Sequence, residues 1–242
     1  MTRVRSARRR RLPREERISS IMRAARAVFC EKGYREALTM EIAARAGVVE
    51  GSIYRYFDGK RDLLIKVVEE WYRQTLASYD AELRGVHGTR QRLRFMIWKH
   101  LSILRGEPEM CRLVLRELRP DPDYRDTVVY ELNREYTRRT IDIVEQGIRD
   151  GELRADAPRR IVRDLIFGGI EHLTWSYLRH EGDFSPEEAA DSITDLLYRG
   201  LAEQGADDGD ESQTAAPDVA LRRLENVTSR LELLAARNGA TT

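Results

Sequence analysis

The chain has 242 residues, which is long enough for two small domains or for one domain joined to a large helical body. Its 42 Lys and Arg residues balance 41 Asp and Glu residues, so the net charge of +1 excludes no class of partner, while two cysteines exclude a disulfide framework and indicate a reducing compartment. Since the sequence has neither a signal-like N-terminus nor an apolar run of about 18 residues, we expect a cytoplasmic protein without a membrane span.

The first twelve residues are predicted to form a basic arm, because arginines are concentrated at the start of the chain. Such an arm beside a DNA-binding module would add attraction to phosphates, and a solvated tail without a partner is the alternative. Eight arginines lie within the first 17 residues: Arg3, Arg5, Arg8, Arg9, Arg10, Arg11, Arg14 and Arg17.

A first helix is predicted from about residue 13 to residue 32, because apolar side chains recur there at helical spacing. A glycine at position 33 should end this helix. The apolar stripe consists of Ile18, Ile21, Met22, Ala25, Val28 and Phe29.

Residues 39–57 have the pattern of a helix-turn-helix. Thr39 is placed to be the hydroxyl N-cap of a short helix, in which Ile42 and the alanine four residues later share one face. Gly47 can adopt the left-handed conformation that ends such a helix and turns the chain. A recognition helix of about residues 50–57 would follow and present polar and aromatic side chains to a partner.

Helical spacing continues after this motif, and no alternating strand pattern is present, so the sequence predicts an all-α fold. Glycines and prolines separate the successive segments. The further helices are predicted at about 60–83, 89–105, 107–118, 123–149, 157–180 and 186–203.

The chain changes character after the last of these helices. Residues 205–217 are acidic and small with almost no apolar side chain, which is typical of a flexible linker. Residues 218–237 then predict a short coiled-coil helix that would support dimerisation or dock on the body. Its apolar positions, spaced 4, 3, 4 and 3, are Ala220, Leu224, Val227, Leu231 and Leu234.

Residues 14–64 resemble the TetR family of bacterial transcription regulators. The matching segments are Val-Phe-Cys-Glu-Lys-Gly-Tyr, Leu-Thr-Met-Glu-Ile-Ala-Ala-Arg-Ala-Gly-Val, Gly-Ser-Ile-Tyr-Arg-Tyr-Phe and Lys-Arg-Asp-Leu-Leu. The resemblance implies an N-terminal three-helix DNA-binding domain, placed here at residues 13–59. It also implies a C-terminal helical domain, placed at residues 60–204, that dimerises and binds a small effector.

The resemblance assigns DNA contacts to the motif and to the start of the following helix. Ser52 and Tyr56 match positions that contact phosphate, and Tyr54 matches one that contacts phosphate or a base. Arg55 is the candidate for base recognition, because its fork suits guanine O6 and N7. The full expected set is Thr39, Glu50, Gly51, Ser52, Tyr54, Arg55, Tyr56 and Lys60.

Two positions depart from the family pattern, which usually has a hydroxyl N-cap and often a basic residue there. Val49 cannot cap a helix, and Glu50 would repel a phosphate. Glu50 either favours the helix N-terminus through the dipole or accepts a hydrogen bond from a cytosine amino group, and we weight the dipole interpretation more heavily. The departure concerns the operator sequence and leaves DNA binding expected.

The body helices are expected to enclose an effector pocket, although core packing is the alternative role for each lining residue. Ile-Arg-Asp-Gly-Glu-Leu-Arg and, further on, Leu-Ile-Phe-Gly-Gly-Ile-Glu-His look like segments of members that sense fatty acids or acyl-coenzyme A. That likeness implies a small hydrophobic effector. No metal-ligand spacing is present, so no cofactor is expected. The predicted lining residues are Trp71, Phe95, Trp98, Leu101, Leu115, Ile166, Ile170 and His172.

These patterns together predict a transcriptional regulator that binds a palindromic DNA operator as a homodimer and that an effector releases. Gly168 and Gly169 lie in the middle of a predicted helix, where they favour close approach of another helix or a ligand. The alternative is a helical scaffold that acts through its C-terminal coiled coil. An enzyme is not expected, because no nucleophile elbow, metal cluster, glycine-rich phosphate loop or paired carboxylates are present.

Overall fold

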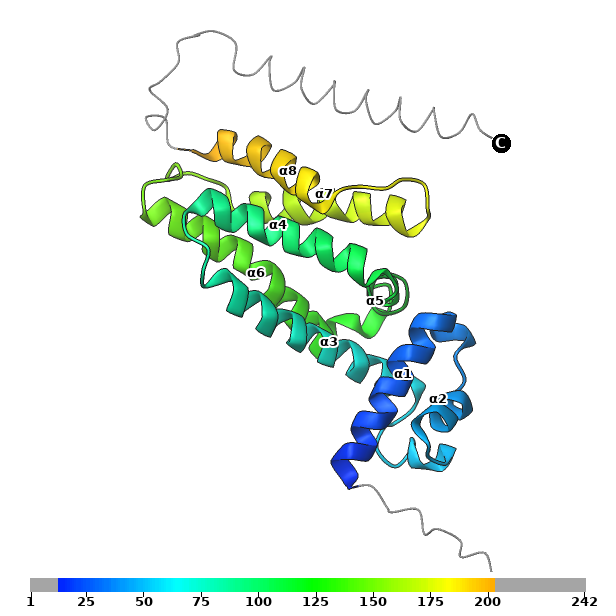
Figure 1. Cartoon of the computed structure of the whole chain (residues 1–242). Helices are drawn as coiled ribbons and strands as arrows, with labels where there is room; N and C mark the ends of the chain where they lie inside the picture. The colour runs from blue at the N-terminus through cyan, green and yellow to red at the C-terminus, as the bar shows by residue number, and fades with distance from the viewer. Residues whose placement is uncertain (1–12, 203–242) are drawn as a thin grey trace, which may run out of the picture. The chain divides into compact units, whose positions relative to one another are not determined.

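A computed structural model describes residues 13–202 (Figure 1). The predicted basic arm, the acidic linker and the coiled-coil helix lie outside the described residues. Within residues 13–202 every regular element is helical, so the predicted all-α fold is confirmed. In this range no helix combines the length and the apolar character needed to cross a membrane.

The observed helices follow the predicted order with small shifts at their ends. Besides the α-helices, the described residues contain three short helical turns: the 3₁₀ turns η1 (Glu50–Ser52) and η3 (Pro122–Asp126), and the π-helical turn η2 (Val114–Leu118). The α-helices are α1 (Arg14–Glu36), α2 (Thr39–Ala46), α3 (Lys60–Leu83), α4 (Thr89–Gly106), α5 (Pro108–Leu113), α6 (Val128–Arg149), α7 (Arg159–Leu178) and α8 (Pro186–Leu201).

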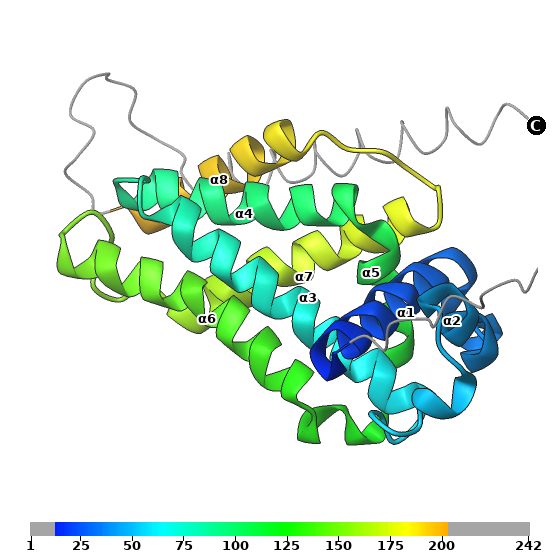
Figure 2. The same cartoon turned by 60° about the horizontal axis from the view of Figure 1, so that its bottom comes forward.

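Contacts divide the described chain into two compact units (Figures 1 and 2). Unit 1 holds residues 13–82 and 106–136, which include α1, α2, α3, α5 and the first turns of α6. Unit 2 holds residues 83–105 and 137–202, which include α4, the rest of α6, α7 and α8. Unit 1 therefore combines the helix-turn-helix with residues 106–136, which lie far along the chain.

The first helix buries four of the six residues of the predicted stripe, and leaves Ile18 and Met22 half-buried. Ile21, Ala25 and Phe29, spaced four residues apart, are 0%, 0% and 1% exposed. Gly33 leaves helical geometry at φ 77° and ψ 167°, so the predicted break is present, and the chain makes one more helical turn to Glu36.

Unit 2 is built on helical faces of the same period. Leu93, Ile97 and Leu101 of α4 are buried at i, i+4 and i+8. Ile166 and Ile170 of α7 are also fully buried, four residues apart. These helices turn one apolar face inward and leave their charged faces outside, as the 3.6-residue period requires.

The two cysteines lie in unit 1 as partly buried free thiols. Burial raises the pKa of the Cys30 thiol and raises that of Cys111 to about 12. A thiol that stays protonated at neutral pH is a poor nucleophile. The burial of both thiols therefore suits small hydrophobic residues rather than a redox sensor.

Gly147 of α6 provides a direct test of packing in unit 2. An added Cβ there would lie 2.6 Å from Thr89 Cγ2 and 3.0 Å from Leu153 Cδ1. We expect Gly147→Ala to lower the free energy of unfolding by about 1–3 kcal/mol through overpacking, measured by urea denaturation at fixed protein concentration. Gly106→Ala is the matched control, because a Cβ there meets nothing within 4 Å. Equal stability of the two variants would contradict this packing.

Candidate nucleic-acid interface

Ion pairs hold α2 against α1 in unit 1. Arg45 Nη1 donates to Glu31 Oε1 at 2.7 Å, and Lys32 Nζ donates to Glu41 Oε1 at 2.5 Å. Each bond joins a side chain of α1 to a side chain of α2. Exposed pairs of this kind contribute little free energy individually, but they help to set the orientation of the two helices.

Gly47 ends α2 in the left-handed conformation that the sequence predicts, with φ 69° and ψ 29°. The N–H of Val48 donates to the carbonyl of Ala43 at 3.0 Å, which closes the helix C-terminus. Ser20 Oγ of α1 donates to the carbonyl of Ala46 at 3.1 Å. The turn that leads to the recognition segment is therefore fixed by backbone and side-chain bonds.

The predicted N-cap role of Thr39 is wrong. Leu38 is the N-cap residue, and the N–H of Ile42 donates to its carbonyl at 3.2 Å, so α2 starts one residue earlier than expected. The Thr39 hydroxyl is directed toward the recognition segment instead, where it contacts Glu50 and Tyr54.

The expected regular recognition helix at residues 50–57 is also corrected. The segment is the 3₁₀ turn Glu50–Ser52 followed by further tight turns. The N–H of Tyr56 donates to the carbonyl of Ile53 at 3.0 Å, an i−3 bond. Val49, the N-cap of this turn, has no side-chain oxygen to satisfy a backbone N–H, which favours a short turn over a longer helix.

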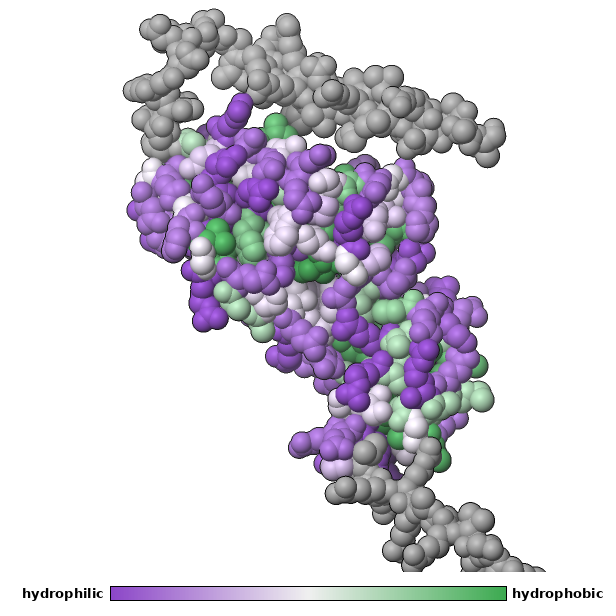
Figure 3. All heavy atoms as spheres, viewed as in Figure 1, coloured by the Kyte–Doolittle hydropathy of each residue, from purple (hydrophilic) through white to green (hydrophobic). Residues whose placement is uncertain are grey.

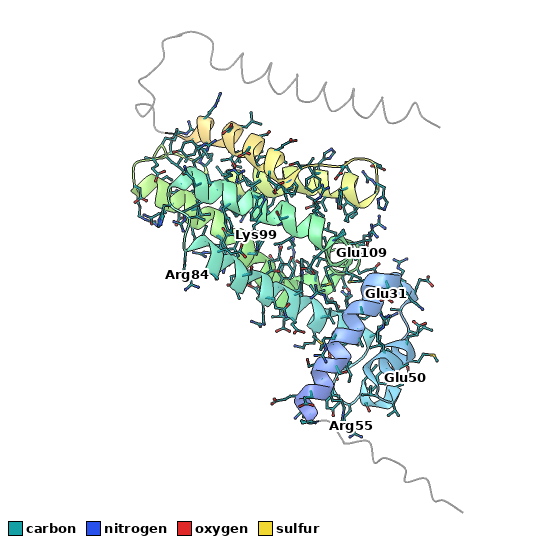
Figure 4. All side chains as sticks on the ribbon, in the orientation of Figure 1. Glu31, Glu50, Arg55, Arg84, Lys99 and Glu109 are labelled. Carbon is teal, nitrogen blue, oxygen red and sulfur yellow. The ribbon has the colours of Figure 1, made fainter. Side chains whose placement is uncertain are left out.

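Ile53 and Phe57 anchor the recognition segment by their burial, at 0% and 5% exposed. Phe57 is therefore a core residue of unit 1. Between them, Tyr54 and Arg55 are exposed, and Figure 4 shows Glu50 and Arg55 on the outside of this segment. Within the part of the chain that the structure describes, Arg55 has no hydrogen-bond or ion-pair partner.

Tyr56 lies in a basic environment supplied by the start of α1. Arg17 Nη1 donates to the Tyr56 hydroxyl at 3.1 Å, and the guanidinium of Arg14 lies 6.0 Å from the ring centroid. Because Tyr56 accepts in its bond with Arg17, its own proton stays available to a phosphate oxygen. This arrangement fits the phosphate contact expected for Tyr56.

Lys60 ties the start of α3 to the connection between α1 and α2. Its ammonium donates to the carbonyls of Arg35 at 3.2 Å and Ala37 at 2.9 Å, and it lies 4.6 Å from the centroid of the Tyr34 ring. An ammonium has three protons, so one remains for a phosphate. The phosphate contact expected of Lys60 stays a prediction, beside this structural role.

Ser52 and Gly51 complete the predicted DNA-contact set. Ser52 is half-buried, and its N–H donates to the carbonyl of Val49 at 2.8 Å. Gly51 is exposed, and a Cβ there would meet nothing within 4 Å. The fold therefore does not require a glycine at this position, and close approach of a partner's backbone is the remaining physical reason for it.

An exposed apolar surface flanks these polar groups and includes residues that the sequence analysis did not select. Leu38, Met40 and Val49 are 51%, 60% and 74% exposed. Figure 3 shows hydrophobic atoms exposed among charged ones over the part of unit 1 that holds α1 and α2. In a sequence, such a surface is indicated by apolar residues that lie outside the buried stripe of a helix. An exposed apolar surface of this kind suits contact with thymine methyl groups.

The predicted pocket residues divide between the two units. Trp71, buried, and Leu115, half-buried, belong to unit 1. Leu101, Ile166 and Ile170 are buried in unit 2, at 0%, 1% and 0% exposed. Their burial fits a pocket wall and a packed core equally, so their role in ligand binding stays a prediction.

The other three predicted pocket residues lie at or near the surface of unit 2. Phe95 and Trp98 are half-buried with ring centroids 5.8 Å apart. The indole N–H of Trp98 donates to Glu187 Oε1 at 3.0 Å, and this bond lowers the pKa of the Glu187 carboxyl. His172 is exposed on α7.

Unit 2 also has a groove of about 630 Å³, which none of the predicted pocket residues lines. Sequence reasoning missed it, because it forms where the loop before α7 returns alongside α6. Among residues 13–202 no group of three His, Cys, Asp or Glu side chains is placed to hold a metal ion. The groove is lined by Arg138, Ile141, Glu145, Asp156, Ala157, Pro158, Arg159, Arg160 and Ile161.

Two domain families match the chain in consecutive segments. Residues 21–67 match the family described as bacterial regulatory proteins, tetR family, and residues 87–201 match the tetracyclin repressor-like C-terminal domain. The first match covers the helix-turn-helix, and the second covers the helices from α4 to α8.

Similar proteins extend over most of the chain. The fatty acid metabolism regulator protein of Bacillus subtilis is 28% identical over 75% of this chain and 93% of its own length. The transcriptional repressor KstR2 of Rhodococcus jostii is 23% identical over 77% of this chain and 91% of its own length. The crystal structure of the regulator FadR from Bacillus subtilis in complex with stearoyl-CoA superposes with a TM-score of 0.67, at 28% identity, covering 75% and 98% of the two chains.

A helix-turn-helix with an exposed cationic and aromatic recognition segment, joined to a helical body, defines a DNA-binding transcriptional regulator. The chain belongs to the TetR family of these regulators.

Arg55 is the side chain whose loss should change base recognition most simply. We expect Arg55→Ala to weaken binding to the preferred duplex by about 1–3 kcal/mol and to relax one base position, because a bidentate contact to guanine is lost. Competition binding against duplexes that vary one position at a time measures both effects. Arg23→Ala, which removes an exposed α1 arginine bonded to Ser19, is the charge-matched control. An Arg55→Ala variant as tight and as selective as the parent would exclude this role.

Proposed function

We propose that this regulator is a cytoplasmic repressor that a long-chain acyl-coenzyme A releases from its operator. The observation that carries the proposal is the similarity, over three quarters of the chain, to a regulator crystallised with stearoyl-CoA. The proposed action is binding alone, with no catalytic step. The residues expected to line the effector site are those predicted from the sequence.

Unit 1 offers a physical connection between DNA binding and the C-terminal domain. Arg61, at the start of α3, donates to the carbonyl of Glu117 at 2.9 Å and pairs with the carboxylate of Asp121. Arg26 of α1 pairs with Glu107. Glu107, Glu117 and Asp121 all belong to the region matched to the C-terminal family. A shift in that region would therefore change the contacts that Arg26 of α1 and Arg61 of α3 make with it.

The π-helical turn η2 is the candidate movable element in this connection. The N–H of Arg119 donates to the carbonyl of Val114 at 2.9 Å, an i−5 bond. Turns of this type occur mostly as single insertions and often at functional sites. A ligand that favours a regular α-helix here would displace the Glu117 carbonyl from Arg61. Coupling of about 1–3 kcal/mol would change operator affinity roughly five- to 150-fold.

The homodimer is expected to form through α7 and α8. Leu165 of α7 and Leu196 of α8 are 59% and 50% exposed. Gly168 and Gly169 are exposed, with nothing within 4 Å of an added Cβ, so their predicted close approach to another helix does not occur among residues 13–202. A second copy against this face would explain the small residues. Two-fold symmetry would then place two recognition segments about 34–36 Å apart, one DNA turn.

Leu165→Glu tests this dimer face. A carboxylate buried in an apolar interface is costly, so we expect the variant to sediment as a monomer at micromolar concentration while the parent sediments as a dimer. Met40→Glu introduces the same charge at a position that is 60% exposed in unit 1 and should leave the mass unchanged. A dimeric Leu165→Glu protein with parental affinity would place the interface elsewhere.

Stearoyl-CoA tests the proposed effector class. With a duplex selected from a random library, we expect saturating stearoyl-CoA to weaken binding five- to 150-fold, as linkage between two sites allows. Coenzyme A without an acyl chain and stearate without coenzyme A are the controls. Calorimetric binding of stearoyl-CoA without any change in DNA affinity would reject release, and absence of both would reject the effector class.

A further inference from the structure

Three side chains of the helix-turn-helix form a continuous chain of hydrogen bonds on its exposed face. Thr39 Oγ1, at the start of α2, donates to Glu50 Oε1, the first residue of η1. The same Thr39 oxygen lies 3.1 Å from the hydroxyl oxygen of Tyr54. The chain joins α2 to both parts of the recognition segment.

Counting protons fixes the direction of this chain. A threonine hydroxyl has one proton, and Thr39 gives it to the Glu50 carboxylate, which can only accept. The bond between Thr39 and Tyr54 must therefore use the tyrosine proton. While the chain is intact, neither hydroxyl can donate to a phosphate, because the Tyr54 proton goes to the Thr39 oxygen and the Thr39 proton goes to the Glu50 carboxylate.

The remaining acceptor capacity of Glu50 points outward. Glu50 is exposed, and its Oε2 has no hydrogen-bond or ion-pair partner within the described residues. An exposed carboxylate next to DNA is repelled by phosphate, so its presence costs affinity unless it meets a donor. In the major groove the amino group of cytosine is such a donor.

The other bases are unfavourable partners for a fixed carboxylate. Guanine presents two acceptors, N7 and O6, and thymine presents O4. Adenine has an amino group, but its acceptor N7 lies beside it. A carboxylate held in place would therefore favour cytosine partly by repelling the alternatives, which is how specificity against a wrong partner is often obtained.

The short turn η1 weakens the dipole interpretation of Glu50. The turn η1 has three residues, and its N-cap Val49 makes no side-chain bond to a backbone N–H. The helix dipole grows by alignment of successive peptide units, so a turn this short supplies little of it. Glu50 is instead held by a side chain from the preceding helix.

We propose that Glu50 is a cytosine-selecting residue and that Thr39 and Tyr54 position its carboxylate rather than bind phosphate. The proposal rests on DNA binding by the recognition segment. Arg55 would then donate two hydrogen bonds to a guanine, and Glu50 would accept one from a cytosine. Thr39 and Tyr54 act through Glu50 and are positioning residues.

The test selects preferred duplexes from a random library with the full-length parent and with variants. The parent should select one cytosine per half-site at the position facing Glu50. Glu50→Gln keeps the shape but adds a donor, so we expect its preference for cytosine over guanine at that position to fall about tenfold. Its affinity for random DNA should rise, because a negative charge is removed.

Two further variants separate positioning from phosphate binding. Thr39→Val and Tyr54→Phe keep the side-chain shape. Thr39→Val removes both bonds of the hydrogen-bond chain, and Tyr54→Phe removes only the bond between Tyr54 and Thr39. We expect each to lose part of the cytosine preference while its affinity for random DNA and its salt dependence stay at the parental values. Glu36→Gln, an exposed charge removal at the end of α1, is the control for charge alone and should keep the parental base preference. Thermal unfolding checks that each variant is folded.

The outcomes are distinct. A parent that selects no motif would contradict the regulator function itself. A parental motif that Glu50→Gln retains at every position, with or without a uniform gain in affinity, would overturn base selection by Glu50. Thr39→Val or Tyr54→Phe binding all duplexes more weakly, with a shallower salt dependence and unchanged base preference, would show a phosphate contact and overturn the positioning role.

Discussion

The DNA-binding face depends on the left-handed backbone at Gly47. This conformation ends α2 after eight residues and turns the chain so that the recognition segment folds back beside it. Burial of Ile53 and Phe57 then fixes that segment from inside, while Thr39 contacts it from α2. A side chain with a Cβ at Gly47 would be strained at φ 69°, whatever space surrounds it. The surface that meets DNA is thus set by one backbone conformation and two buried side chains.

The same unit ties this face to the part of the chain that the effector is proposed to control. Arg61 lies in the first turn of α3, shortly after the recognition segment, and its guanidinium bonds to a π-helical turn far along the sequence. Hydrogen bonds to a charged donor are stronger than neutral ones and depend on geometry, so a change in that turn alters the bond directly. The start of α3 is therefore joined, inside unit 1, to a segment of the C-terminal family match through a short path of named contacts.

The sequence predicted the features that depend on local spacing, and failed where distant side chains compete. Helical period predicted α3 and α8 within a few residues of their ends, and Gly47 predicted the turn. The N-cap role of Thr39 failed because its hydroxyl bonds to Glu50, eleven residues later, which no local pattern reveals. The same limit applies to the groove beside α6 and to the contacts of Lys60, since both depend on how separate segments pack.

Binding of the purified protein to DNA from upstream of its own gene, followed by fluorescence anisotropy at several salt concentrations, tests the central claim most directly. A sequence-specific regulator should show saturable binding that outcompetes random DNA and falls steeply with salt, because specific base contacts add to phosphate contacts. Binding that is weak, equal on all sequences and carried by salt-sensitive attraction alone, here and on duplexes from a random library, would contradict a sequence-specific regulator.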